Sequence, residues 1–367
     1  MKRLAALLSL SLLASGAALA GTPATTVYCI DDATEFSSVL SALNALSSHD
    51  RNYEFRFRPG TFPSNTTYPV SANFNALIAW RPRWVTVYDH YTFKMSGEWN
   101  AGCTAQNAPG GTTSTINGLD VNAILYTSDY DYTATNYTPV VVEIDRIDFW
   151  RYNGYGVLVR PDGGPHDVKI TNSRFRAGVG TAISVNTDTV ELSNSLFENN
   201  TTGSSFFYLI DIDSEGATYT TNNTLRNNTL PSGSQRALVK LGNTLTSAPS
   251  GYAVFENNVI YQTTLSGSSD LLMTDTLARI RNNIFDTTLV AGTPLFISNN
   301  YNINPKFAFS AGAQLATDSP ARDIGNNAAL NGATLDLYGR VRVQNQVVDL
   351  GAYELTPSEN LFANGFE

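Results

Sequence analysis

Two consecutive segments of the chain follow one pattern, Val168-Lys169-Ile170-Thr171-Asn172-Ser173-Arg174-Phe175 and Val190-Glu191-Leu192-Ser193-Asn194-Ser195-Leu196-Phe197. In each segment apolar and polar residues alternate, a polar pair with asparagine interrupts the alternation, and a short apolar step follows. Alternation with a period of two is typical of a strand that buries one face. Asparagine tolerates the left-handed backbone conformation that a tight bend needs. Each segment therefore predicts two short strands joined at a bend.

The same pattern recurs through the middle of the chain. It occupies residues 142–149 before these two segments, and it returns in segments that end at residues 225, 260 and 285. The polar pairs of the six segments begin 22 to 35 residues apart, which is the repeat length of a solenoid. A further short apolar strand, such as residues 182–185, lies between successive segments. Three strands in each repeat predict an all-β fold, a parallel β-helix whose coils stack on one another.

The first residue of most polar pairs is an asparagine, and it falls at the same bend of each predicted coil. Asparagine at a bend can also hydrogen bond to the asparagine of the next coil. We therefore expect a structural ladder of five side chains, Asn172, Asn194, Asn222, Asn257 and Asn282.

The composition of the chain is poor in charge. Charged residues make up 15% of its 367 residues, against about 25% in an ordinary soluble protein. With 23 Lys+Arg and 32 Asp+Glu the net charge is −9, which excludes a nucleic-acid partner bound through its phosphates. A hydrophobic content of 42% excludes a disordered chain. A stacked coil explains the low charge, because its turns can carry neutral polar residues instead.

The first 20 residues predict a cleaved signal peptide. Lys2 and Arg3 precede an apolar stretch over residues 4–13, and the small residues Ala18-Leu19-Ala20 form a cleavage pattern. The mature chain would begin at Gly21, with 21 basic and 32 acidic residues and a net charge of −11. No later stretch approaches the roughly 20 apolar residues of a membrane span. We therefore expect an exported protein with no transmembrane segment in its mature chain.

Cys29 and Cys103 are the only cysteines of the chain. In an exported protein disulfides persist, so one bridge across a separation of 74 residues is the simplest pairing. Two free buried thiols are the alternative. With only three histidines in the chain, we do not expect these cysteines to bind a metal.

Residues 34–46 predict one short amphipathic helix. Phe36, Leu40 and Leu43 follow helical spacing, and Thr34 or Asp32 can serve as the N-cap. A strand ending at Pro59-Gly60 follows directly, and no second helix is evident after it.

The two ends of the chain resemble exported bacterial right-handed β-helix proteins of the pectin-lyase-like superfamily. At the N-terminal side the resemblance rests on Cys29, the short helix, Arg58-Pro59-Gly60-Thr61-Phe62 and Ser96-Gly97-Glu98-Trp99-Asn100-Ala101-Gly102-Cys103. At the C-terminal side Ser319-Pro320-Ala321-Arg322-Asp323-Ile324-Gly325 and Asp349-Leu350-Gly351-Ala352-Tyr353-Glu354 are similar to the segment called choice-of-anchor Q. The resemblance implies a right-handed coil in a protein located in the extracellular medium or at the bacterial cell surface.

The expected organisation is a single coil with a cap at each end. Residues 21–110 would form the N-terminal cap and first coils, 111–310 the central coils, 311–356 a C-terminal cap and 357–367 a terminal tail, which resembles a short C-terminal tag. Both caps would cover open strand edges, which otherwise invite aggregation. Asp323, Asp336 and Asp349 are expected to cap turns in the C-terminal segment, with a calcium site as the alternative.

The best candidate site is a polar patch on the strand that follows each asparagine bend. Outward positions on neighbouring coils lie about 4.8 Å apart, and this brings together Asp211, Asp213, Lys240, Arg160 and Asp188. In pectin-lyase-like enzymes, by resemblance, this sheet carries the active cleft.

Three functions could use this patch. The main hypothesis is a non-catalytic module that binds polysaccharide or adheres to a cell-surface glycan. The alternative is a polysaccharide lyase, in which Asp211 and Asp213 would hold calcium while Lys240 or Arg160 removed a proton. A glycoside hydrolase is less favoured, because the pattern around Asp188 resembles polygalacturonases only in part and lacks their Asp-Asp and Gly-His-Gly motifs.

Overall fold

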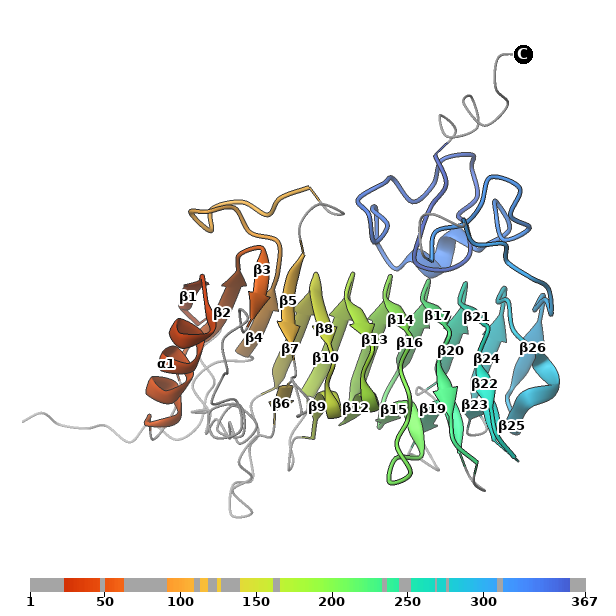
Figure 1. Ribbon diagram of the computed structural model, residues 1–367, viewed down its shortest axis with the longest axis horizontal. Helices are drawn as coiled ribbons and strands as arrows, with labels where there is room; N and C mark the ends of the chain where they lie inside the picture. Colours follow the sequence, from red (N-terminus) through yellow and green to blue (C-terminus); the bar gives the residue numbers. More distant parts are fainter. Residues whose placement is uncertain are drawn as a thin grey trace, which may run out of the picture.

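Three parallel sheets wound from one chain form the body of the protein, as the computed structural model shows (Figure 1). The structure describes residues 23–46, 50–62, 91–108, 113–117, 124–126, 139–160, 166–232, 236–243, 252–267, 269–274, 277–308 and 313–356. The predicted signal peptide and the tail 357–367 lie outside the described residues. Every strand pairing in the three sheets is parallel, so the predicted all-β parallel coil is confirmed.

Sheet I has ten described strands and passes through the whole coil: β1 (Thr25–Ile30), β2 (Asn52–Phe57), β4 (Tyr91–Ser96), β7 (Val140–Asp145), β10 (His166–Thr171), β13 (Thr189–Ser193), β16 (Thr218–Thr221), β20 (Ala253–Glu256), β24 (Ala278–Arg281) and β26 (Phe296–Ser298). Sheet II follows the asparagine bend: β3 (Gly60–Phe62), β5 (Ser114–Asn117), β8 (Ile147–Trp150), β11 (Arg174–Arg176), β14 (Leu196–Glu198), β17 (Thr224–Arg226) and β21 (Val259–Tyr261).

Sheet III completes each coil: β6 (Ile124–Tyr126), β9 (Asn153–Val159), β12 (Val179–Thr187), β15 (Tyr208–Ser214), β19 (Ala237–Asn243), β23 (Asp270–Thr274) and β25 (Val290–Gly292). The remaining elements are the strand pair β18 (Thr229–Leu230) and β22 (Thr264–Leu265) and the short 3₁₀ helices η1 (Thr287–Leu289) and η2 (Asn327–Leu330).

Inward side chains of successive coils stack to form the core. The rings of Phe149 and Phe175 lie 4.8 Å apart, and those of Phe175 and Phe197 lie 4.9 Å apart. All three are fully buried. Burying one such side chain contributes about 1.5–3 kcal/mol, so the repeat of apolar residues at one position per coil is what drives the stacking.

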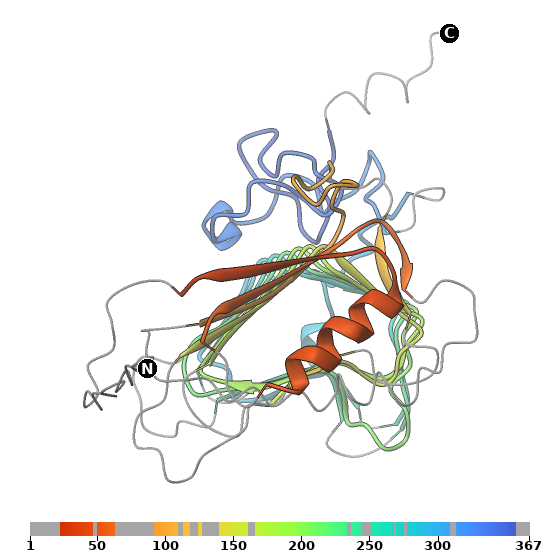
Figure 2. The ribbon, with the colours of Figure 1, turned by 90° about the vertical axis from the view of Figure 1, so that its left-hand side faces the viewer.

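Helix α1 (Ala33–Asn44) lies across the N-terminal end of the coil (Figure 2). Asp32 is its N-cap and accepts hydrogen bonds from the backbone amides of Thr34 and Glu35. Its buried face is formed by Phe36, Leu40 and Leu43. The helix ends two residues earlier than the predicted boundary at residue 46. A disulfide joins Cys29 to Cys103, with Cα atoms 5.7 Å apart, and so links β1 to the loop after β4.

The bend between sheets I and II is formed by the polar pairs of the sequence, and the two residues of a pair have different structural roles. Asn172, Asn194, Asn222, Asn257 and Asn282 all have φ between 50° and 58°, which is the left-handed region. The buried ladder is formed by the residue after each of them. Asn223 donates to Asn258 Oδ1 (3.1 Å), Asn258 to Asn283 Oδ1 (3.1 Å) and Asn283 to Asn300 Oδ1 (2.8 Å). A second short ladder joins Asn200 to Asn228 at the next bend.

Three of the first asparagines of the pairs bind the C-terminal segment, and Asn257 Nδ2 also donates to Asn222 Oδ1 at 3.1 Å, a contact of the predicted ladder. Asn194 Nδ2 donates to the Leu335 carbonyl (2.9 Å), and Asn257 Nδ2 donates to the Asn326 carbonyl (2.9 Å). Asn222 Nδ2 likewise donates to the Ala329 carbonyl, at 3.2 Å. We expected residues 311–356 to cover the end of the coil, but the described part of this segment lies along its side (Figure 1). The reason is that the left-handed asparagine at the bend points its side-chain amide outward, and this amide group needs a hydrogen-bond partner.

Removal of one rung should destabilise the whole coil. In Asn258→Ala the Thr220 carbonyl and the Asn223 amide lose their partner, since Asn258 binds both. Unsatisfied buried groups cost about 1–3 kcal/mol, and we expect a loss of that size in urea unfolding. Asn153→Ala, which removes an exposed asparagine of β9, should change stability by less than about 0.5 kcal/mol. Equal effects of the two changes would contradict the role of the ladder.

Candidate functional site

The predicted patch lies on the outer face of sheet III. The register of β12, β15, β19 and β23 places Ser184, Asp211, Lys240 and Met273 in one row across four coils. Asp213 lies two residues after Asp211 on the same strand and opposite Gly242. Strand alternation in the sequence predicted this row, because the residues on either side of it point into the core.

Lys240 joins the two carboxylates of the patch. Its Nζ lies 2.7 Å and 2.8 Å from the two carboxylate oxygens of Asp213 and 3.3 Å from Asp211 Oδ1. Gly242 makes this possible, since a Cβ at that position would lie 1.9 Å from Asp213 Oδ1. We call Asp211, Asp213 and Lys240 the sheet III cluster.

Protonation in the sheet III cluster favours charged lysine. Burial lowers the pKa of Lys240, but its hydrogen bond to Asp213 and the charges of both aspartates outweigh burial and leave the pKa raised. Burial also raises the pKa of Asp211, against the opposing charge of Lys240. Lys240 is therefore protonated at neutral pH and unsuited to act as the general base of a lyase.

The remaining predicted residues are only partly gathered at this place. Arg160 Nη2 donates to Ser184 Oγ at 3.0 Å, and its charge acts on Asp211, so it lies beside the cluster. Asp188 follows β12 at a corner of the coil, where burial first and then the charges of Glu215 and Asp167 raise its pKa. The structure therefore groups Asp188 with other carboxylates and not with Lys240.

The sheet III cluster does not fit the calcium ion that the lyase hypothesis places between Asp211 and Asp213. The ammonium of Lys240 already lies between Asp211 and Asp213, where a cation would have to bind. In the part of the chain that the structure describes, no three His, Cys, Asp or Glu side chains gather to hold a metal ion. In the C-terminal segment, Asp336 and Asp349 accept hydrogen bonds from backbone amides such as Tyr338 N (2.8 Å) and Asp323 N (2.7 Å), which is turn capping.

Aromatic side chains flank the sheet III cluster at the start of β15. Phe207 is 51% exposed, and the Tyr208 ring centroid lies 5.4 Å from Lys240 Nζ. Arg236 stacks 5.3 Å from the Phe207 ring and donates to the carbonyls of Ser204 (2.7 Å) and Phe206 (2.8 Å). These aromatic residues were not among the predicted site residues, although their position before the outward-facing Asp211 was a signal for them.

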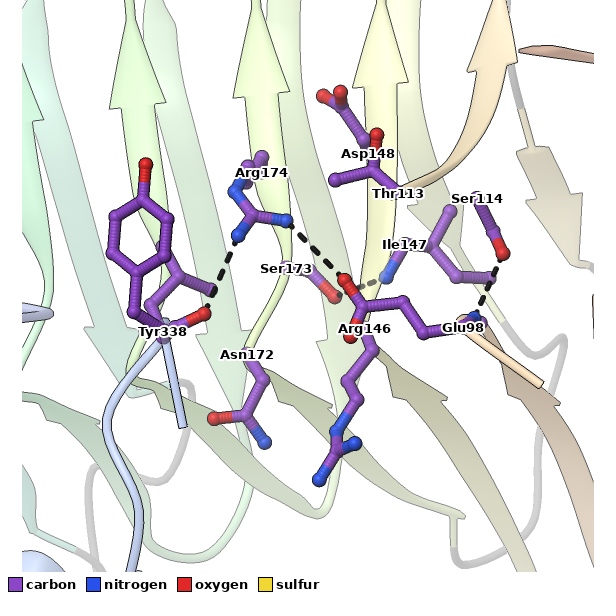
Figure 3. Close-up of polar contacts among 12 residues, drawn as sticks. Glu98, Thr113, Ser114, Arg146, Ile147, Asp148, Asn172, Ser173, Arg174 and Tyr338 are labelled. Carbon is purple, nitrogen blue, oxygen red and sulfur yellow. Dashed lines mark hydrogen bonds and ion pairs between the residues drawn. The ribbon is translucent and has the colours of Figure 1, made fainter. Parts of the chain in front are cut away.

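A second polar cluster, buried on sheet II, is shown in Figure 3. Glu98 Oε1 lies 3.7 Å from Arg174 Nη1, and Arg174 Nη2 donates to the Leu337 carbonyl at 3.3 Å. Burial raises the pKa of Glu98, while the charge of Arg174 opposes the rise. Glu98 is only 2% exposed. This pair therefore fixes the loop after β4 and the C-terminal segment against sheet II, and it is closed to a ligand.

A third cluster lies inside the C-terminal segment around Arg342, which is fully buried. Its Nη1 lies 3.8 Å from Glu354 Oε2, and its Nη2 donates to Asn222 Oδ1 at 3.0 Å. Burial raises the pKa of Glu354 to about 8, and the charge of Asp349 adds to the rise. Burial likewise raises the pKa of Asp349 to about 6.

The pKa of Glu354 predicts how stability depends on pH. A carboxyl group whose pKa is raised by folding stabilises the folded state below its ordinary pKa, and the contribution is lost as pH rises through the folded value of about 8. We expect the urea concentration at the unfolding midpoint of the wild type to decrease as pH rises from 5 to 9. The decrease should be steeper than that of Glu354→Gln. Glu143→Gln, on the exposed face of sheet I, should keep the wild-type slope. Parallel slopes for wild type and Glu354→Gln would refute this assignment.

None of the described helices has the length and apolar character needed to cross a membrane.

Comparison with known proteins agrees with the architecture. A family model described as "Right handed beta helix region" matches residues 142–328, about half of the chain. No curated protein matches the sequence. The matched region contains the asparagine bends, the sheet III cluster and the flanking aromatic residues.

Proposed function

The chain belongs to the right-handed β-helix family, and on that premise we propose that it is an exported module that binds polysaccharide through the outer face of sheet III. The disulfide between Cys29 and Cys103 supports export, since such bonds persist in oxidising compartments. The pattern of residues 1–20 supports it independently.

The observation that carries the binding function is the sheet III cluster beside exposed aromatic rings. Two carboxylates held by Lys240 accept hydrogen bonds from sugar hydroxyl groups. The exposed face of Phe207 offers an apolar surface for the C–H face of a sugar ring. This single row crosses four coils of sheet III, which suits an extended chain better than a small molecule.

Binding is favoured over catalysis by the chemistry of the same residues. Both carboxylates share one ammonium group, and the raised pKa of Lys240 keeps this group protonated. A lyase needs a basic group near the substrate, and a hydrolase needs one carboxyl group as acid and another as base or nucleophile. The arrangement of the sheet III cluster provides neither.

A glycan-binding assay tests this proposal. The mature full-length protein would be applied to an array of plant, bacterial and animal polysaccharides, and affinities for bound glycans would be measured by affinity electrophoresis. We expect Phe207→Ala and Asp213→Asn each to weaken binding about tenfold, the value of a free-energy loss of about 1.4 kcal/mol. Phe296→Ala, which removes an exposed ring of β26, is the matched control and should bind as the wild type does.

The same preparation tests the alternative. The bound glycans would be incubated with the protein, with and without calcium, and assayed for unsaturated or reducing-end products. We expect no product. Product formation that Asp213→Ala abolishes would replace the binding module with an enzyme, and absence of binding to every glycan would overturn the proposal as a whole.

A further inference from the structure

A cavity of about 170 Å³ opens on the outer face of sheet I, where β16, β20 and β24 meet the C-terminal segment at η2. Pockets for drug-sized ligands span about 300–1,000 Å³, so this one suits a single ring. Its polar lining includes Tyr219, Tyr252, Glu256, Arg279 and Arg281. The cavity lies on a different sheet from the sheet III cluster.

Arg279 is the group that sets the charge of this cavity. Its Cζ lies 4.5 Å from the centroid of the Tyr252 ring, and its side chain is exposed. No ion pair involves Arg279 among the residues that the structure describes. Stacking on Tyr252 orients the guanidinium and leaves its N–H edges available to a planar anion.

The other polar groups of the cavity are held in place by one another. Arg281 Nε lies 2.7 Å from Glu256 Oε1, and Asn326 of the C-terminal segment donates to the same oxygen at 2.7 Å. The rings of Tyr219 and Tyr252 pack edge to face, with their centroids 6.2 Å apart. Glu256 therefore neutralises Arg281, and the cavity keeps the one positive charge of Arg279.

The rest of this face shows that the unpaired cation is unusual. In earlier coils the outward positions carry alternating charges, with Lys94 Nζ 3.3 Å from Glu143 and Lys169 Nζ 3.2 Å from Glu191. On the two strands next to Arg279 the same row holds Val254 and Phe296. Among the described residues no carboxylate forms an ion pair with Arg279, and in a chain of net charge −9 such a cation points to an anionic ligand.

We propose that this cavity binds one acidic saccharide unit, a sugar ring that bears a carboxylate. Arg279 pairs with the carboxylate through two N–H groups. The Tyr219 and Tyr252 hydroxyl groups bind ring hydroxyl groups. This site is independent of polysaccharide binding on sheet III, because it shares no residue with it.

Ligand-observed NMR titration of the full-length mature protein tests the site with three probes, a free hexuronate, the corresponding neutral hexose and acetate. We expect saturable binding of the hexuronate and at least about tenfold weaker binding of the other two. Arg279→Gln should weaken hexuronate binding about 10–100-fold, because a charged hydrogen-bonded pair is lost.

Two control variants establish whether hexuronate binding depends on Arg279 itself. Lys169→Gln removes a cation from the same sheet face, and Asn153→Ala changes an exposed residue of sheet III outside both sites; both should bind the hexuronate as the wild type does. Thermal unfolding of each variant checks that it is folded. Failure of the wild type to bind hexuronate, equal binding of acetate or hexose, or unchanged binding by folded Arg279→Gln would overturn the inference and leave the sheet III proposal intact.

Discussion

The structure depends on one hydrogen-bonded arrangement, the buried asparagine ladder at the bend between sheets I and II. Asn258 binds the Thr220 carbonyl and the Asn223 amide of the previous coil, and it donates to Asn283, the next asparagine of the stack. Backbone groups at a bend have no strand partner, and burying them without one is costly. The left-handed asparagine before each rung turns the chain. The two residues of each polar pair therefore set both the bend and the alignment of successive coils.

The bend also determines which faces of the coil stay open. The outward amides of Asn194 and Asn257 bind the C-terminal segment, and Arg174 joins it to sheet II. Sheet II is therefore covered along these coils. The two candidate sites lie on the outer faces of sheets I and III. The cavity on sheet I exists only because the C-terminal segment, at η2, forms one of its walls.

The two sites differ in how their charges are balanced. On sheet III the ammonium of Lys240 is shared by two carboxylates, which suits hydroxyl groups of a neutral or mixed chain. On sheet I Arg279 stacks on the Tyr252 ring, and its row neighbour is Val254 where the earlier coils carry charged residues.

The sequence by itself determined the β-helix fold, because repeated alternation and asparagine bends are local patterns. It also determined the row of Asp211 and Lys240, since strand alternation and the repeat length place residues on one face. Only the tertiary structure decided what these residues contact. Lys240 bridges two carboxylates because Gly242 leaves room for Asp213, and the C-terminal segment lies on the side of the coil because outward amides bind it. Contacts between residues far apart in the chain depend on packing, which no local pattern records.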